Sequence, residues 1–213
     1  MRERKQVYGW GINDADYPLE PVVNGKRQRC NFFLTWRRMI WRCYDGKRLK
    51  EYPSYIGCSV AEEWKRFSDF KAWMVEQDWV GKHLDKDIIC PGNKVYSSQT
   101  CVFVHPTINN FFTDAFRLRG EFMIGVRFHK GKRKFQGHCS NPFTKKVDHL
   151  GYFDREIDAH LAWLRRKNEL AIQLSQSDYV TDDRVADALR SRYAQRLRQQ
   201  ADQIEAEQEN SHA

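Results

Sequence analysis

The stretch LDKDIICPGNKVYSSQTCVFVHPTINN, residues 84–110, decides the fold that we expect for this protein. Residues 84–89 predict a strand, residues 90–94 a turn with its Gly-Asn pair, and residues 101–104 a second strand. A helix is expected from near His105, because the proline that follows suits the first turn of a helix, where its missing N–H would be unsatisfied anyway. The stretch therefore predicts a small strand-turn-strand-helix unit.

This unit carries more directed polarity than a core hairpin needs. We expect it to bring Asp85 or Asp87, Asn93, His105 and Asn109 within reach of one point. Oxygen ligands of this kind are the ones that hard divalent cations prefer. We therefore interpret the unit as able to hold a divalent metal against a phosphate.

The overall composition favours a nucleic-acid partner. The chain has 213 residues, enough for one ordinary domain or two small ones with a real core. Its 36 Lys and Arg against 28 Asp and Glu give a net charge of +8 and a pI near 9.2. A basic chain is attracted to polyanions through counterion release, so double-stranded DNA leads the expected partners.

The cysteines and the apolar segments bear on the compartment. Six Cys lie at positions 30, 43, 58, 90, 101 and 139, without a CxxC pair and without an N-terminal apolar signal region. Scattered Cys are mostly small buried side chains in a reducing compartment, which predicts a cytoplasmic protein. A structural zinc site built from distant Cys is a less favoured alternative. No apolar run has membrane-spanning length, so no membrane contact is expected.

Two helices are predicted before the central stretch. Residues 1–30, rich in Gly and Pro, predict an irregular arm that either lies along DNA or stays in solvent. Apolar residues from Trp36 to Cys43 recur at helical spacing and predict a helix over 34–44, whose Arg residues are either a solvated face or phosphate contacts. An aromatic stripe over 61–79 predicts a second helix that packs in the core.

The C-terminal part has a different pattern. Alternating apolar residues predict strands over 122–128, 133–139 and 149–153, which form a three-stranded antiparallel sheet packed on a helix over 154–174. Thr181 is a suitable N-cap for a last helix with apolar residues every four positions. That helix packs on the body or pairs with a second copy, so a monomer and a homodimer both remain open.

The predicted sheet carries much of the positive charge. Between positions 120 and 150 there are seven Lys and Arg against two acids. If the apolar side chains face the helix, polar and basic ones stand on the open face, where Arg and Lys can read guanine and Gln can read adenine. An ordinary solvated sheet face is the alternative. The predicted DNA-binding residues are Arg127, Lys130, Lys132, Arg133, Lys134, Gln136 and His138.

These motifs carry a resemblance in two parts. WRRMIWRCY at 36–44, the aromatic run at 60–70 and the stretch 84–110 together resemble the phage-type HNH homing endonucleases. IGVR, a basic hairpin, LGYFD and an Ala-containing helix within 121–170 resemble the Apetala-type (ethylene-response-factor) DNA-binding domain. The resemblance implies an α+β chain with an irregular arm (1–30), an HNH-like ββα-metal domain with aromatic-rich helices (31–118), an Apetala-like domain (119–178) and a C-terminal amphipathic helix with its tail (179–213).

The resemblance also implies roles for single residues. Asp85, Asp87 and Asn109 would bind one divalent metal, Mg²⁺ with Mn²⁺ as the alternative, and Asn93 would brace the loop between the strands. The metal would polarise the phosphate that a water attacks. This sequence departs from the family at the general base, because Lys86 stands where a His is usual.

A Lys that is protonated at neutral pH cannot accept a proton, and its acidic neighbours keep it protonated. His105, and less favourably His83, are the substitutes for the base, while Lys86 could instead clamp a phosphate.

Two functions follow from these expectations. The first is a metal-dependent DNA endonuclease, a nickase or homing-type enzyme targeted by its C-terminal sheet and located in the host cytoplasm if it is phage-encoded. The alternative is a catalytically degenerate HNH-like DNA-binding protein with a regulatory or anti-defence role. RNA binding is less favoured, because no aromatic stacking platform is evident on the basic sheet.

Overall fold

The computed structural model describes residues 6–113 and 121–211 and shows an α+β protein with two compact units, which divide between Val104 and His105. Each unit is described by itself. The sequence placed the domain boundary between 118 and 119, whereas residues 105–113 belong to the second unit. The predictions for the first five residues of the arm and for 114–120 lie outside the described residues.

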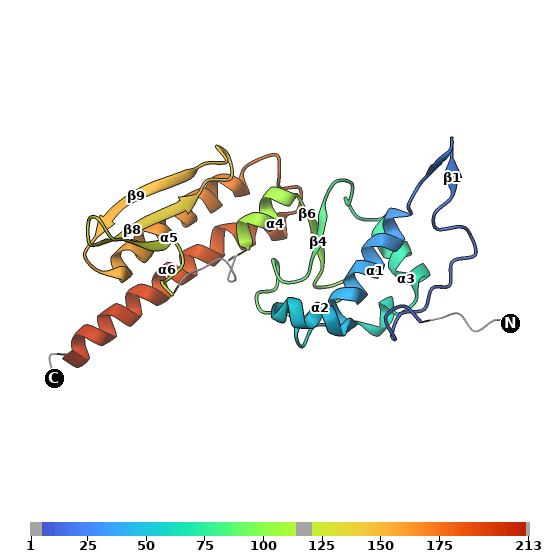
Figure 1. Ribbon diagram of the computed structural model, residues 1–213, viewed down its shortest axis with the longest axis horizontal. Helices are drawn as coiled ribbons and strands as arrows, with labels where there is room; N and C mark the ends of the chain where they lie inside the picture. Colours follow the sequence, from blue (N-terminus) through green and yellow to red (C-terminus); the bar gives the residue numbers. More distant parts are fainter. Residues whose placement is uncertain (1–5, 114–120, 212–213) are drawn as a thin grey trace. The chain divides into compact units, whose positions relative to one another are not determined.

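The first unit consists of short elements around two helices (Figure 1). Strands β1 and β2 form an antiparallel hairpin, β3 pairs in parallel with β5, and β4 pairs antiparallel with β6. In chain order the elements are β1 (Val22–Val23), β2 (Lys26–Arg27), α1 (Asn31–Tyr44), α2 (Gly46–Glu51), η1 (Pro53–Tyr55), β3 (Ser59–Val60), η2 (Glu62–Trp64), α3 (Phe67–Val75), β4 (His83–Asp85), β5 (Val95–Tyr96) and β6 (Val102–Val104).

An aromatic core joins α1 to α3. Trp36 is fully buried, and its indole Nε1 donates a 2.8 Å hydrogen bond to the carbonyl of Trp64. The Trp64 ring packs edge to face on Phe70, with centroids 5.1 Å apart. The predicted inward face of α1 is confirmed, since Trp36, Met39, Ile40 and Cys43 are all buried. Each large apolar side chain buried in this way stabilises the fold by about 1.5–3 kcal/mol.

The prediction of one long helix over 61–79 is wrong. The chain forms η2 and then the separate helix α3, because the backbone of Ile12 pairs with the residues between them. The Ile12 N–H donates to the Lys65 carbonyl at 2.8 Å, and the Phe67 N–H donates to the Ile12 carbonyl at 3.0 Å. A distant tertiary contact thus replaces the helical hydrogen bonds that local periodicity predicted.

The described part of the expected arm packs on this core. Val7, Trp10 and Leu19 lie against the aromatic cluster. Gly11 approaches α1 so closely that a Cβ atom there would be 2.5 Å from Ile40 Cδ1. Residues 6–30 are mostly irregular, as expected, but they belong to the fold and are not a free arm.

The central stretch forms shorter strands than predicted. Strand β4 ends at Asp85, because Asp85 Oδ1 accepts the backbone N–H groups of Asp87 and Ile88, both at 2.8 Å, and so turns the chain. The pairing of β4 with β6 and the helix after His105 agree with the sequence prediction. Val95 and Tyr96, which were not expected to pair, form β5 beside β3.

The second unit is a three-stranded antiparallel sheet on one helix, as predicted, with strand order β7-β8-β9 (Figure 1). Gly137 faces α5 so closely that a Cβ atom would lie 3.2 Å from the Ala159 carbonyl. Leu189 and Tyr193 of α6 are buried. The elements are α4 (Pro106–Phe112), β7 (Val126–His129), β8 (Lys134–Ser140), β9 (Val147–Phe153), α5 (Glu156–Ser175) and α6 (Asp183–Ser211). The first strand begins at Val126, later than predicted.

Candidate nucleic-acid interface and acidic turn

The register of the second unit defines an open sheet face. Lys134 and Gln136 alternate with Gly137, which faces α5, so they lie on the opposite face of β8. The pairing of β8 with β9 is interrupted by a β-bulge between Gly137 and His138. His138 lies on the same face as Gln136, because Arg127 and His149 are its charged and polar neighbours. Their cross-strand partners share that face: His129, Arg127, Tyr152 and His149. We call these seven residues, with Ser140 and Val147 at the loop end of the strands, the open face.

Arg127 and Gln136 form the centre of the open face. The Arg127 Nε donates to Gln136 Oε1 at 2.7 Å, and Gln136 Nε2 lies 3.1 Å from His149 Nδ1. Gln136 is only 5% exposed, whereas Arg127 is exposed. The expectation that Gln136 reads adenine does not fit this geometry, because both ends of its amide already have protein partners.

His138 lies beside this network and is partly buried. Burial lowers its pKa, and the nearby Arg127 and His149 lower it further, whereas the hydrogen bond that the ring donates to the backbone of Gln136 raises it. Its Nδ1 is buried and has no hydrogen-bond partner among the described residues. The lowered pKa favours the neutral imidazole.

The basic hairpin forms one end of the open face. Lys130, Lys132 and Arg133 are exposed, and the Lys132 ammonium lies 3.8 Å from the centroid of the Tyr152 ring. Lys134 pairs with Asp154 at 3.1 Å and so is partly neutralised.

Three residues of this face were missed by the sequence reasoning: Tyr152, His129 and His149. Tyr152 is 38% exposed and packs against the ring of His129. Adjacent side chains in a strand point to opposite faces of the sheet, so an inward Phe153 in the LGYF sequence (residues 150–153) predicts an outward Tyr152.

The acidic turn of the first unit has a different organisation. Lys86 is 6% exposed, and its ammonium donates to Asp87 Oδ2 at 2.8 Å and to the Asn93 carbonyl at 3.0 Å. Burial opposes its charge, but the hydrogen bond and charge of Asp87 outweigh it and raise the pKa of Lys86. Lys86 is therefore a charged, buried brace of the loop, and this placement fits neither a base nor a phosphate clamp.

Asn93 completes the brace. Its Nδ2 donates to the carbonyls of Lys86 and Val95, both at 2.7 Å, as expected for a residue that holds the loop. Burial raises the pKa of Asp85, and the charge of Asp87 raises it further, against lowering by the backbone N–H groups that Asp85 accepts. Two carboxylates thus stand close together beside one ammonium.

Arg42, which the sequence analysis assigned either to a solvated helix face or to phosphate contact, lies beside the acidic turn. It hydrogen-bonds Tyr96, and it lies near enough to Asp85 for charge attraction. Burial opposes its charge, yet these partners leave the pKa of Arg42 raised.

His105 and Asn109 belong to the second unit. His105 caps α4, where its Nδ1 accepts the Thr107 N–H at 3.2 Å, and its ring stacks on Tyr179. In this arrangement the Nδ1 lone pair is used by the Thr107 N–H, and the ring carries its proton on Nε2. Asn109 is partly buried on α4. The predicted meeting of these two residues with the acidic turn involves both units and stays a prediction.

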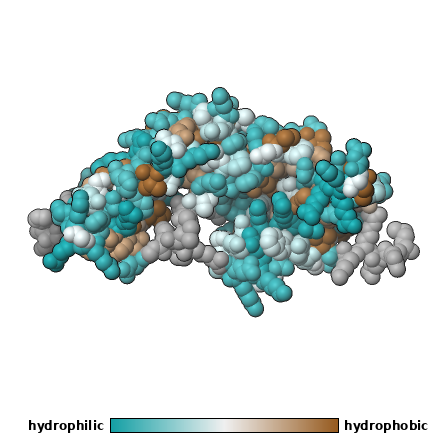
Figure 2. All heavy atoms as spheres, turned by 45° about the horizontal axis from the view of Figure 1, so that its top comes forward, coloured by the Kyte–Doolittle hydropathy of each residue, from teal (hydrophilic) through white to brown (hydrophobic). Residues whose placement is uncertain are grey.

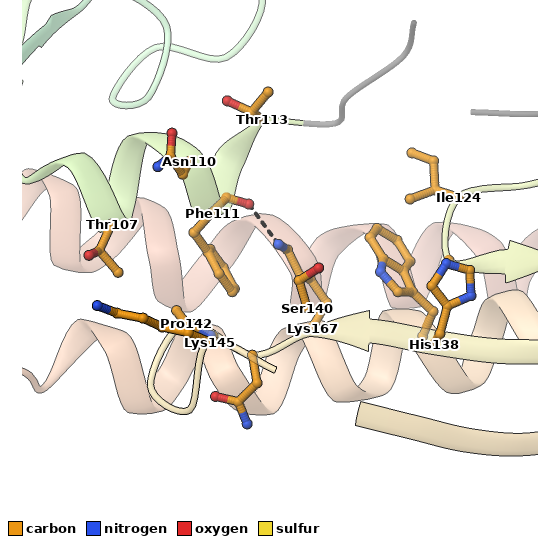
Figure 3. Close-up of a pocket in the computed structure, with 13 residues that line it drawn as sticks. Thr107, Asn110, Phe111, Thr113, Ile124, His138, Ser140, Pro142, Lys145 and Lys167 are labelled. Atoms are coloured by element: carbon orange, nitrogen blue, oxygen red, sulfur yellow. Dashed lines mark hydrogen bonds between the residues drawn. The ribbon is translucent and has the colours of Figure 1, made fainter. Parts of the chain in front are cut away.

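A pocket of 640 Å³ lies in the second unit, between α4, the end of β8 and α5 (Figure 3). Its described lining includes His138, Ser140, Lys145 and Lys167. The Lys167 ammonium donates to the Phe111 carbonyl at 2.6 Å. The Trp163 ring is covered by Gly125, so it offers little stacking surface. The size suits a small ligand, but the polar groups do not converge on one point.

Few potential metal ligands lie close together in the described residues, which bears on the predicted divalent-metal site and on the zinc alternative. Among residues 6–113 and 121–211, no group of three or more His, Cys, Asp or Glu could hold a metal ion. Burial raises the pKa of Cys43 and of Cys101 to about 12 and that of Cys139 to about 11, which keeps these thiols protonated. Carboxylate and amide oxygens of the acidic turn still fit Mg²⁺ by their chemistry.

The surface of the described chain adds two observations. Hydrophilic residues cover most of the visible face, and hydrophobic ones form separate patches (Figure 2). Among the described side chains of α6, Val185, Ala186, Leu189 and Tyr193 are buried, and Leu197 and Ile204 are partly exposed. Within the described ranges, no helix is both long enough and apolar enough to cross a membrane.

No family model, no curated protein and no solved structure matches this chain.

Proposed function

We propose that this protein binds double-stranded DNA through the open face of its three-stranded sheet. The observation that carries the proposal is the Arg127–Gln136–His149 network, which fixes an exposed guanidinium at the centre of a basic face. A fixed guanidinium keeps its two terminal nitrogens for bidentate contact with a guanine edge. The cations of the hairpin around it would contact phosphates, which give affinity without sequence information.

Fluorescence anisotropy with a labelled 30-base-pair duplex tests this proposal. Arg127→Ala is expected to weaken binding by about 1–3 kcal/mol when the duplex contains a preferred site. Lys132→Ala is expected to reduce the slope of log K against log salt by about 0.9, the value for one lost phosphate contact.

Arg165→Ala serves as the matched control, because Arg165 is exposed on α5 and not on the open face. Equal affinity of the wild type and the Arg127 and Lys132 variants would exclude the open face as the DNA-binding surface.

Metal-dependent cleavage of DNA is the second candidate function. The specific observation in its favour is the pair of close carboxylates, Asp85 and Asp87, in a loop that Asn93 braces. These carboxylates would hold Mg²⁺ or Mn²⁺, which supplies Lewis-acid activation of a phosphate. The binding of Lys86 to Asp87 and the capping role of His105 leave both candidate bases engaged. They favour the catalytically degenerate, regulatory protein over the active nickase.

A plasmid assay separates the two. Supercoiled plasmid is incubated with the full chain and Mg²⁺ or Mn²⁺, beside Asp85→Ala and Asn109→Ala variants. Nicking that both substitutions abolish would establish the enzyme. Binding without nicking in either metal would leave a DNA-binding protein.

A further inference from the structure

The loop between β8 and β9, residues 141–146, presents an exposed aromatic ring beside two cations. Phe143 is 42% exposed. Lys145 and Lys146 follow it, both exposed, and neither forms an ion pair with another residue of the described ranges. One exposed apolar residue is common on protein surfaces, so its meaning depends on how the loop is held.

The loop is held rigidly by Asn141, which is 8% exposed. The Asn141 Oδ1 accepts the N–H groups of Phe143 at 3.0 Å and Thr144 at 3.2 Å. Its backbone N–H donates to the Lys146 carbonyl at 2.8 Å, and its carbonyl accepts from the Lys145 N–H at 2.9 Å. Lys145 adopts a left-handed backbone conformation (φ 56°) that few non-glycine residues take, and these hydrogen bonds hold it there.

A further contact ties the loop to the helix behind the sheet. The Asn141 Nδ2 donates to Asp148 Oδ2 at 3.1 Å, and Arg166 of α5 donates to the same oxygen at 2.9 Å. The Phe143 ring is therefore presented by a preorganised loop, and little ordering entropy remains to be lost when it meets a partner.

The loop continues the open face. Ser140 and Val147 form the last pair of β8 and β9, and Val147, which is 49% exposed, shares the open face with His149. Ser140 lies four residue steps beyond Gln136 along β8, which is about 13 Å at the usual strand rise. For strands that follow a groove, this corresponds to about four base-pair steps from the bases that Arg127 reaches.

We infer that Phe143 is a wedge that inserts between stacked base pairs of DNA bound on the open face. The inference rests on the proposed DNA binding. Proteins that kink DNA insert apolar side chains such as Phe between base steps and partially unstack them. Phe143 is exposed on the braced loop, and the exposed Lys145 and Lys146 that follow it would contact phosphates beside that step. The consequence is local unwinding and a kink at the loop end of the site.

A topology assay with closed circular plasmid tests the wedge without knowledge of the target site. The full chain is bound to the plasmid in EDTA, which prevents metal-dependent cleavage, and a type IB topoisomerase relaxes the DNA before the protein is removed. Wild-type protein is expected to leave negative supercoils in proportion to the amount bound. Phe143→Ala is expected to lose this change while its affinity falls by no more than a few-fold, and Phe143→Trp is expected to retain it.

Ile172→Ala is the matched control, since Ile172 is 41% exposed on α5, and it should behave as wild type. Replacement of Lys145 and Lys146 together by Ala should lower the salt slope of binding by about 1.8. Bound wild type that leaves the linking number unchanged, or an unchanged effect in Phe143→Ala, would overturn the wedge but not the DNA binding. A wild type that does not bind the plasmid in a parallel gel-shift assay would overturn both.

Discussion

The Nε of Arg127 donates a 2.7 Å hydrogen bond to Oε1 of Gln136, its cross-strand partner, and Gln136 is in turn placed by His149 of the third strand. One residue from each strand thus contributes to the position of a single guanidinium. Gln136 is buried by this arrangement, so its contribution to DNA binding is to order Arg127 before DNA arrives.

Replacement of Gln136 by Met should therefore weaken DNA binding although Gln136 does not reach DNA. The expected loss is about 0.5–1.5 kcal/mol, the cost of ordering one flexible side chain on binding. The salt slope should not change, because no phosphate contact is lost. Fluorescence anisotropy over a salt series measures both quantities.

A double-mutant cycle with Arg127→Ala provides the control for this prediction. If Gln136 acts only through Arg127, Gln136→Met has no further effect once Arg127 is absent. An equal loss in both backgrounds would mean that Gln136 contacts DNA directly.

Replacement of Lys86 by Met should destabilise the first unit. It removes the cation that Asp87 and the Asn93 carbonyl share, and the side chain of Lys86 is only 7% exposed. A buried acceptor left without its donor costs about 1–3 kcal/mol. Urea unfolding followed by tryptophan fluorescence measures the change.

Lys130→Met is the control for that experiment, because Lys130 is exposed and should change stability by less than about 0.5 kcal/mol. If Lys86→Met were as stable as wild type but bound DNA more weakly, Lys86 would be a phosphate ligand and not a brace.

Local patterns in the sequence predicted the elements that depend on neighbouring residues. Helix α1, the Pro106 helix start and the three-stranded sheet on one helix follow from periodicity and turn chemistry. Distant contacts could not be predicted in this way. The pairing of Ile12 with the Lys65 and Phe67 backbones ends one helix and starts another, and nothing near residue 65 indicates it.

For the candidate sites, the sequence predicted residue types but not the directions or the burial of the side chains. The residue types of the acidic turn and the side of the sheet that carries Arg127 were accessible from the sequence. The direction of Lys86 was not, because it depends on its hydrogen bond to the Asn93 carbonyl, seven residues further along the chain. The burial of Gln136 also depends on two residues, Arg127 and His149, that are distant in sequence.

Replacement of Gly11 by Ala should show that residues 6–30 belong to the fold. The added methyl would lie 2.5 Å from Ile40 Cδ1 and 2.8 Å from the Trp36 ring. Both partners are fully buried and cannot move aside, so we expect a loss of about 1–3 kcal/mol in the free energy of unfolding. Gly46→Ala is the matched control, because nothing lies within 4 Å of its Cβ position, and it should leave stability equal or up to about 1 kcal/mol higher. Equal stability of the Gly11 variant and wild type would mean that this segment detaches at little cost.

The pH dependence of stability should contain a contribution from His138. Its folded-state pKa is lowered, chiefly by burial and then by Arg127 and His149, below the usual value of about 6.5. As pH falls below 6.5, His138 becomes protonated in the unfolded chain but not yet in the folded chain, so the free energy of unfolding decreases. The decrease ends once the pH is below the pKa of His138 in the folded chain, because both states are then protonated. Thermal unfolding at pH 8 and pH 5.5 should therefore show a smaller fall in Tm for His138→Asn than for wild type. Identical falls in the two proteins would assign the acid sensitivity to other groups and leave His138 without a role in it.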